Sequence, residues 1–212
     1  RIIKLAIPLA LNEFLLGVSF LILSAILNVL GTEAAAAVGV AGKGAAFIMI
    51  FTSAFSQALA AFVAQNAGAG NMKRARKAWL SGSALACAFG GLLCMIIFLF
   101  GTTACSIFSK DPEVIRLASD FSKAYAVDTV FSAAMFCTCG YLNGCGRSEI
   151  TLVQCMIGVA ARIPAAFLLM NLGGGNMFIT GLCIPISTLC QLIFLLIYLK
   201  VSERRSDMAS NA

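Results

Sequence analysis

Six long apolar runs occupy most of this 212-residue chain. A helix needs roughly 20 mostly apolar residues to cross a bilayer, and each run is about that long or longer. Backbone N–H and C=O groups find no water inside the hydrocarbon layer, so a single run can satisfy them there only as a helix. We therefore predict an all-α integral membrane protein. The predicted spans are residues 2–30, 34–66, 78–100, 121–142, 151–172 and 177–199, and residues 200–212 form a polar, disordered cytoplasmic tail.

The scarcity of charge supports this class, because only 11% of residues are charged, against about 25% in soluble domains. The net charge of +6 comes largely from short links between the runs, so it does not indicate nucleic-acid binding. Histidine is absent, and Cys137-Thr138-Cys139 has no usual zinc spacing. No pairing of serine with a base can be identified either. The sequence thus predicts a protein that is not an enzyme and holds no metal or cofactor.

The links between the runs are short, except for residues 101–120. Within that stretch Asp111-Pro112-Glu113 predicts a helix start, with Asp111 as the cap and Pro112 in the first turn. We expect a short interfacial helix there, leading into the fourth span. The chain opens at Arg1 rather than at a methionine, which suggests a fragment or a chain cut from something longer.

The distribution of basic residues predicts the orientation in the membrane. Six spans put both termini on one side, and that side also carries the link between the second and third spans. The basic residues on the side of the termini are Arg1, Lys4, Lys73, Arg74, Arg76, Lys77, Arg147, Lys200, Arg204 and Arg205. The opposite side carries only Lys110, Arg116 and Lys123. By the positive-inside rule, both termini are cytoplasmic. Trp79, Tyr141 and Tyr198 then fall at the inner interface, where aromatic residues are enriched.

Glu13, Lys43, Asp128 and Arg162 lie within the predicted spans and away from their ends, and charges inside a membrane are functional candidates. At 1.5 Å per helical residue, Glu13 lies about 16 Å, Asp128 about 20 Å and Arg162 about 16 Å from the inner end of its span. These three fall near the midplane. Lys43 lies about 35 Å from the inner end of its span, so its side chain should reach outward to the interface.

Two interpretations of these charges stay open. In the structural one, Arg162 neutralises Asp128 or Glu13 and holds helices together. In the functional one, Glu13 or Asp128 binds a coupling proton, a sodium ion or an organic cation. Asn12, Gln57 and Ser132 are further candidates, because their polar groups could line a cavity. Each of them could equally form a hydrogen bond between helices.

Sequence 65–75, Gln-Asn-Ala-Gly-Ala-Gly-Asn-Met-Lys-Arg-Ala, closely resembles the Q-N-x-G-A-G-x-x-x-R-A turn of the multidrug and toxic compound extrusion (MATE) transporters. Shorter matches follow in the order of the family. They are Ile7-Pro8, residues 108–115, Leu142-Asn143-Gly144-Cys145-Gly146-Arg147, Arg162-Ile163-Pro164 and Pro185-Ile186-Ser187. Together these matches cover nearly the whole chain, and the form of the turn resembles that of the carboxy-terminal lobe.

This resemblance implies one lobe of a twelve-helix transporter built from two six-helix lobes. Such proteins reside in the cell membrane and export organic cations and other amphipathic compounds, exchanging them for H⁺ or Na⁺ by alternating access. In some branches the coupling carboxylates lie in the first and fourth spans of this lobe, which here carry Glu13 and Asp128. Asp128 lies about one turn before the position of the family's aspartate, which falls closer to Ser132. The implied partners are the substrate, the bilayer, and an amino-terminal lobe or a second copy.

Two alternatives remain at the level of function. A relative in the same superfamily flips lipid-linked oligosaccharides, and a cleft lined by several arginines would favour it, whereas only Arg162 lies deep in this sequence. An unpaired half-transporter could also act only after assembling with a partner.

Overall fold

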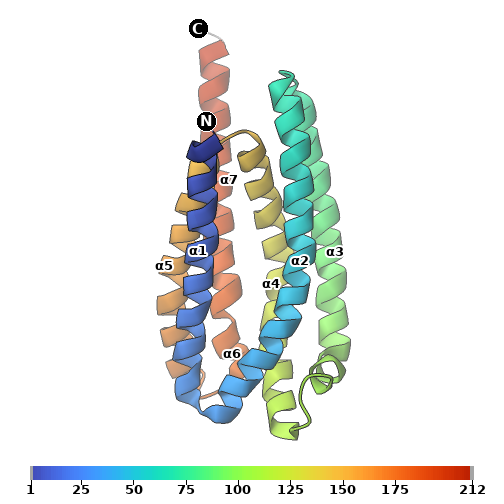
Figure 1. The fold of residues 1–212 in the computed structure, drawn as a ribbon, viewed down its shortest axis with the longest axis vertical. Helices are drawn as coiled ribbons and strands as arrows, with labels where there is room; N and C mark the ends of the chain where they lie inside the picture. Colours follow the sequence, from blue (N-terminus) through green and yellow to red (C-terminus); the bar gives the residue numbers. More distant parts are fainter. Residues whose placement is uncertain (1, 211–212) are drawn as a thin grey trace.

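The computed structural model describes the backbone of residues 2–210 and the side chains of residues 7–202. This part of the chain is almost entirely helical and contains no strand, which confirms the predicted all-α class. Figure 1 shows the long helices running alternately up and down, so that α1 begins and α7 ends at the same end of the bundle. In chain order the elements are α1 Ile2–Leu27, the 3-10 helix η1 Asn28–Leu30, α2 Thr32–Gly68, α3 Met72–Ser106, α4 Pro112–Gly144, α5 Ser148–Leu172, α6 Met177–Gly181 and α7 Cys183–Ser210.

Five stretches of the described helices are long and apolar enough to cross a membrane. They are Ile7–Leu30, Thr32–Gly68, Met72–Ser106, Ser148–Leu172 and Met177–Ser202. Helix α4 is also long, at 33 residues, but it carries more polar and charged residues and does not meet this criterion. Because other helices cover much of its surface, α4 needs a less continuous apolar sequence than the helices around it.

Helix α4 occupies the centre of the fold, with its most extensive contacts on α2 and α3 and further contacts on α7. Glycines let α4 approach α2 closely. A Cβ added at Gly144 would lie 2.7 Å from Ala60 O, and one added at Gly140 would clash with the Ser56 carbonyl. Gly140 and Gly144 form a G-x-x-x-G pattern, which brings backbones together in membranes. This close approach sets the position of the α4 side chains relative to α2.

The residues before the fourth run form part of α4, which corrects the prediction of a separate interfacial helix. Asp111 caps this helix as predicted, since Oδ1 accepts a hydrogen bond from the Glu113 backbone N–H at 2.9 Å. The helix then continues without a break to Gly144. The apolar pattern marks only the part of a helix that lies in hydrocarbon, while backbone hydrogen bonding carries the same helix into the interface.

The last predicted run is divided in the structure. The short helix α6 ends at Gly181, and α7 begins at Cys183, one residue before Ile184 and two before Pro185. Proline has no N–H to donate, which favours a helix start at this point. The backbone of α7 is helical as far as Ser210, whereas a disordered tail was predicted from Lys200 onward.

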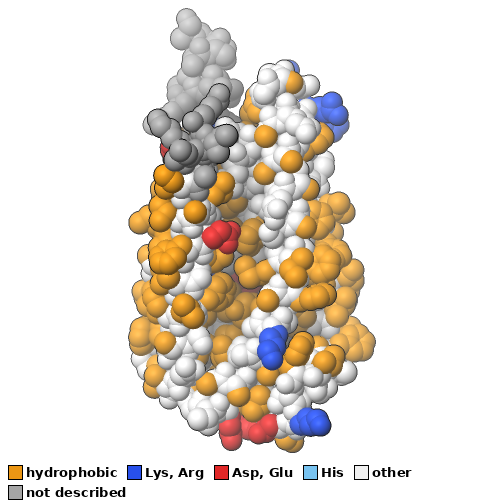
Figure 2. All heavy atoms as spheres, in the orientation of Figure 1, with side chains coloured by type: hydrophobic (Ala, Val, Ile, Leu, Met, Phe, Trp, Pro, Cys, Tyr) orange, Lys and Arg blue, Asp and Glu red, His pale blue; other side chains and the backbone are white. Residues whose placement is uncertain are grey.

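The helices fall into two groups that diverge on the face shown in Figure 2. Helices α1, α5 and α7 pack together on one side, and α2, α3 and α4 on the other. A buried apolar cluster joins the groups near the links at the end opposite the termini, and it includes Leu27, Ala37, Phe121 and Ile184. Elsewhere α1 and α2 make few contacts, and the surface between the groups is hollowed. Of the candidate polar residues, Glu13 and Gln57 line the cleft between α1 and α2 on this face.

Candidate functional site

A small cavity of about 60 Å³ lies in the middle of the fold, where five helices meet. Its walls come from both helix groups, so it depends on how the groups sit against each other. The lining residues are Leu16, Phe20, Ala45, Ile48, Met49, Thr52, Tyr125, Asp128, Thr129, Ser132, Met135, Phe136, Arg162, Ile184, Thr188 and Gln191. Three of the predicted site residues, Asp128, Ser132 and Arg162, are thus brought together.

Asp128 is the buried carboxylate of this cavity, with 8% of its surface exposed. Ser132, one helical turn later, donates a hydrogen bond from Oγ to Asp128 Oδ2 at 2.5 Å. The other oxygen, Oδ1, is buried and accepts no hydrogen bond of normal geometry from the described residues, although the Thr188 side chain lies close enough to interact with this carboxyl group. A buried polar atom without a partner is costly, and such groups are rare unless they bind a ligand, an ion or a water molecule. This oxygen is therefore available to a proton or a cation.

Arg162 is the buried cation of the same cavity, with 4% of its surface exposed. Its Nε donates to Ser187 Oγ on α7, and its Nη1 donates to Ser19 Oγ on α1, both at 3.2 Å. The guanidinium carbon also lies 4.7 Å from the centroid of the Phe20 ring. Hydroxyl groups and an aromatic face thus satisfy the guanidinium and connect α5 to α1 and α7.

No ion pair links Arg162 to Asp128 or Glu13 within the described part of the chain. A direct ion pair is therefore not the way in which Arg162 would neutralise either acid. Arg162 and Asp128 face the same small cavity without touching. Their charges still interact there, because a low-dielectric interior screens charges much less than water does.

Glu13 and Gln57 lie apart from this pair, in a wider open cleft of about 660 Å³ between α1 and α2. The wall shared with the inner cavity includes Leu16, Met49 and Phe136, so the two spaces are neighbours. Glu13 is exposed in the cleft, whereas Gln57 Nε2 donates to Ser53 Oγ at 2.9 Å. Glu13 thus presents a negative charge in a cleft with mainly apolar walls.

Asn12 is the predicted site residue that lines neither space. Its backbone carbonyl faces α5 and accepts a weak hydrogen bond from Cys155 Sγ at 3.6 Å. The residue therefore contributes to the contact between α1 and α5. Its neighbour Glu13 points to a different side, because successive residues of a helix are about 100° apart.

Several residues of the cavity went unnoticed in the sequence. Ser19 binds Arg162 and Thr188 lines the cavity, but small hydroxyl residues are frequent in membrane helices and these two carried no individual signal. Ser187, which also binds Arg162, belonged to the Pro185-Ile186-Ser187 match, but that match did not indicate this contact. Tyr125 lies three residues before Asp128, and that helical spacing could have identified it, whereas the position of Thr129 directly after Asp128 could not. Within residues 7–202, no cluster of three His, Cys, Asp or Glu side chains could hold a metal ion.

Comparison with known proteins identifies the family of this fold. The model of the MatE family matches residues 8–168 of the chain. The chain belongs to the MatE family. MatE proteins are transporters, and the hydrophobic helices agree with a multi-pass membrane protein of that kind.

Two curated relatives illustrate the extent of the similarity. The probable multidrug resistance protein NorM of Thermotoga maritima is 27% identical over 174 residues, which are 81% of this chain and 37% of NorM. The multidrug export protein MepA of Staphylococcus aureus is 25% identical over 207 residues, which are 96% of this chain and 45% of MepA. The chain thus spans less than half the length of either relative, as one lobe of a MatE transporter would.

Solved structures give the same result for the fold. A transporter of the MOP superfamily from Pyrococcus furiosus superposes with a TM-score of 0.87 at 16% identity. The superposition covers 95% of this chain and 44% of that one. The MatE chain described here therefore has the fold of a single lobe of a larger transporter.

Proposed function

We propose that this chain is the carboxy-terminal lobe of a secondary antiporter that exports organic cations or drugs in exchange for H⁺ or Na⁺. The family and the names of its relatives, a multidrug resistance protein and a multidrug export protein, support export as the function. The other half of the transporter would be an amino-terminal lobe or a second copy of this chain. It would face the hollowed side between α1 and α2 (Figure 2).

The unpartnered Oδ1 of Asp128 is the observation that carries this proposal. An antiporter needs a group that binds the coupling cation in one conformational state. In the other state the same group binds the substrate or remains empty. In this proposal a proton or a sodium ion binds at Oδ1, while Ser132 holds the second oxygen in place. The positive charge of Arg162 across the cavity opposes a bound cation and so favours its release.

The open cleft beside Glu13 would receive the substrate. An organic cation needs a negative charge and an apolar wall, and Glu13, Leu16 and Met49 supply both. The inner cavity and the cleft share part of their walls. If cation binding at Asp128 shifts Met49 or Phe136, the contacts of a substrate bound in the cleft change as well. This common wall is our proposed route of coupling between ion and substrate.

In the proposed orientation both termini and the turn between α2 and α3 face the cytoplasm of the cell membrane. The basic side chains of that turn, Lys73, Arg74, Arg76 and Lys77, favour this orientation by the positive-inside rule. Trp79 supports it, since its indole lies near the same end and donates to Thr138 Oγ1 at 3.2 Å.

A transport assay tests the coupling role. The protein in its full natural length is reconstituted in proteoliposomes, and uptake of a fluorescent organic cation is driven by a proton or a sodium gradient imposed separately. D128N should abolish transport driven by the coupling gradient while preserving substrate binding, and E13Q should weaken binding. D120N is the matched control, because Asp120 lies on the same helix but pairs with Lys123 outside both spaces. Full gradient-driven transport by D128N would refute the role of Asp128.

A further inference from the structure

A third space, of about 290 Å³, lies between α2, α3 and α4 near the end of the bundle opposite the termini. It adjoins the Asp128 cavity, since both are lined by Ala45, Ile48 and Tyr125. The other lining residues are Val40, Ala41, Lys43, Gly44, Phe47, Ile97, Gly101, Ala104, Cys105, Phe108 and Ser122. The proposed transport mechanism gives this cavity no role.

The cavity has an apolar floor and an aromatic rim. Buried side chains such as Ala45 and Cys105 form the floor, while Phe47 is 66% and Phe108 48% exposed at the opening. An apolar cavity of about 150 Å³ can hold one benzene molecule. By the same proportion, this cavity has room for roughly twelve carbon atoms of a chain.

Lys43 is the charged residue of the lining, and its sign is opposite to that of the acids in the other two spaces. Its side chain is exposed, and Nζ lies 5.5 Å from the centroid of the Phe108 ring. No carboxylate in the described part of the chain forms an ion pair with Lys43, and none lines the cavity. An unpaired ammonium at the rim of an apolar cavity attracts an anion and repels a cation.

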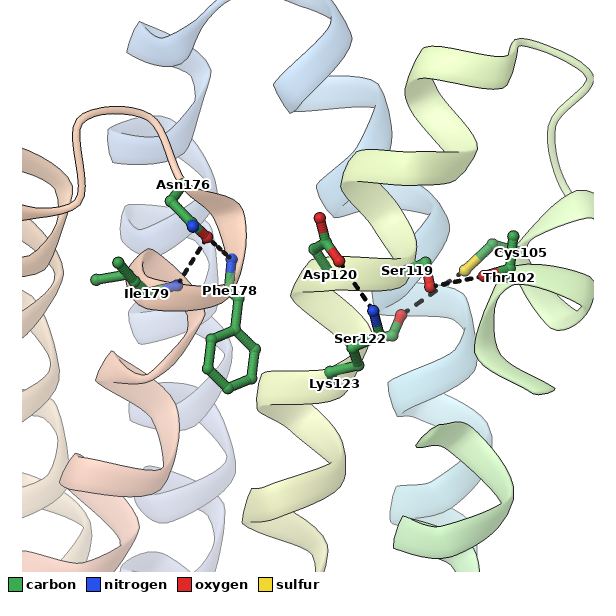
Figure 3. A network of polar contacts seen from close by, with 9 residues as sticks. All are labelled: Thr102, Cys105, Ser119, Asp120, Ser122, Lys123, Asn176, Phe178 and Ile179. Carbon is green, nitrogen blue, oxygen red and sulfur yellow. Dashed lines mark hydrogen bonds and ion pairs between the residues drawn. The ribbon is translucent and has the colours of Figure 1, made fainter. Parts of the chain in front are cut away.

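Two acids of α4 near this end of the bundle already pair with basic residues of the same helix. Asp120 accepts a hydrogen bond from Lys123 at 3.0 Å, and Figure 3 shows this pair together on α4. Glu113 is bound by Arg116 at 2.6 Å. Ser122, on the cavity side of α4, contacts Cys105 Sγ of α3 at 3.8 Å. The wall facing Lys43 thus offers a hydroxyl group and a thiol but no negative charge.

We propose that this cavity binds a medium-chain fatty carboxylate, with its carboxylate at Lys43 and its alkyl chain inside the cavity. The cavity volume fits a single chain of about ten to twelve carbons rather than the two long chains of a phospholipid. The ion pair would form beside the Phe108 ring at the rim of the apolar cavity, where neighbouring apolar side chains screen charges less than water does. The site is distinct from the proposed cation cleft at Glu13, and it prefers the opposite charge.

Photolabelling tests this site with a probe of known chemistry. The full-length protein in zwitterionic nanodiscs is labelled with a diazirine derivative of dodecanoate, and labelled peptides are mapped. Label is expected on α2 and α3, where dodecanoate should compete and dodecyltrimethylammonium should not. K43Q should reduce the apparent affinity about tenfold, and K43E should make the cationic competitor the better one. K110Q is the matched control, since Lys110 lies near the same end of the bundle but does not line the cavity.

A second variant tests the volume of the cavity separately from the charge of Lys43. A104F fills the space without altering Lys43, so it should abolish labelling as well. If dodecanoate and dodecyltrimethylammonium compete with the probe equally well, the proposal is overturned, and the cavity is an apolar space that accepts lipid tails of any charge. Displacement of the probe by an anionic phospholipid, but not by dodecanoate, would overturn it in favour of a phospholipid site. Cation-driven transport is expected to persist in K43Q, so failure here is distinguishable from failure of the antiporter proposal.

Discussion

The close approach of α4 to α2 at Gly140 should make this position intolerant of even one methyl group. In Gly140→Ala, the new Cβ would lie 3.1 Å from Ser56 Cα and from its carbonyl carbon, and the carbonyl oxygen would be closer still. Ordinary contact begins at 3.4 Å, and the atoms in the way belong to the backbone of α2, which cannot turn aside. The two helices must therefore move apart.

Moving α2 and α4 apart costs free energy, because packing contacts between the two helices are lost. A gap of about 0.5–1 Å forfeits a quarter to a half of each dispersion contact across the interface. Overpacking of this kind typically costs about 1–3 kcal/mol, partly offset by the roughly 0.5–1 kcal/mol by which alanine is preferred to glycine in a helix. Gly144→Ala should behave in the same way, since its Cβ would lie 2.7 Å from Val63 Cβ.

Thermal unfolding in detergent measures the effect. For a chain of this size, each kcal/mol corresponds to about 2–4 °C in Tm, so Gly140→Ala should lower the apparent Tm by several degrees. The matched control is Gly91→Ala on α3, where the added Cβ has no neighbour within 4 Å. This variant should leave the apparent Tm unchanged or raise it slightly. An equal rise in Gly140→Ala would refute the close packing of α4 on α2.

Three smaller predictions concern the links and the interface. D111A should destabilise the protein by about 0.5–2 kcal/mol, measured as a lower apparent Tm, because Oδ1 no longer caps α4 at the Glu113 N–H. W79F should cost about 0.5–1.5 kcal/mol in the same assay, because the indole N–H no longer donates to Thr138. T138V should cost less in a W79F background than in the natural sequence, since only the hydrogen bond from Thr138 to the Ala134 carbonyl then remains to be lost. The hydrogen bond from Arg116 lowers the pKa of the Glu113 carboxyl, so this pair stabilises the fold at neutral pH and loses its contribution as the pH falls through the lowered value. The apparent Tm should therefore fall less between about pH 7 and pH 3 in E113Q than in the protein with Glu113. An equal fall of the apparent Tm in both proteins would contradict the role of the pair.

The candidate site was only partly predictable. Asp128, Arg162 and Glu13 stood out because charges are rare inside apolar runs. The partners of Arg162 were not predicted. Nothing in the sequence distinguishes Ser19 from other small polar residues of membrane helices, and the Pro185-Ile186-Ser187 match did not indicate that Ser187 contacts Arg162. Arg162 forms no ion pair with Asp128 or Glu13 among the described residues, and two of its N–H groups donate to hydroxyl groups instead. Which acid, if any, faces a buried cation depends on the rotation of each helix about its own axis.

The elements of this fold follow from local properties of the chain. Long apolar runs require helices in a bilayer, and the Asp111 cap begins α4, because both effects act between residues close together in sequence. The resemblance of residues 65–75 to the MATE turn was equally local, and it led to the correct family. The contacts that form the cavities are different in kind, because Arg162 and Ser19 are 143 residues apart. They exist only once side-chain shape and close backbone approach, as at Gly140, have chosen one packing of the helices among many that hydrophobicity alone would allow.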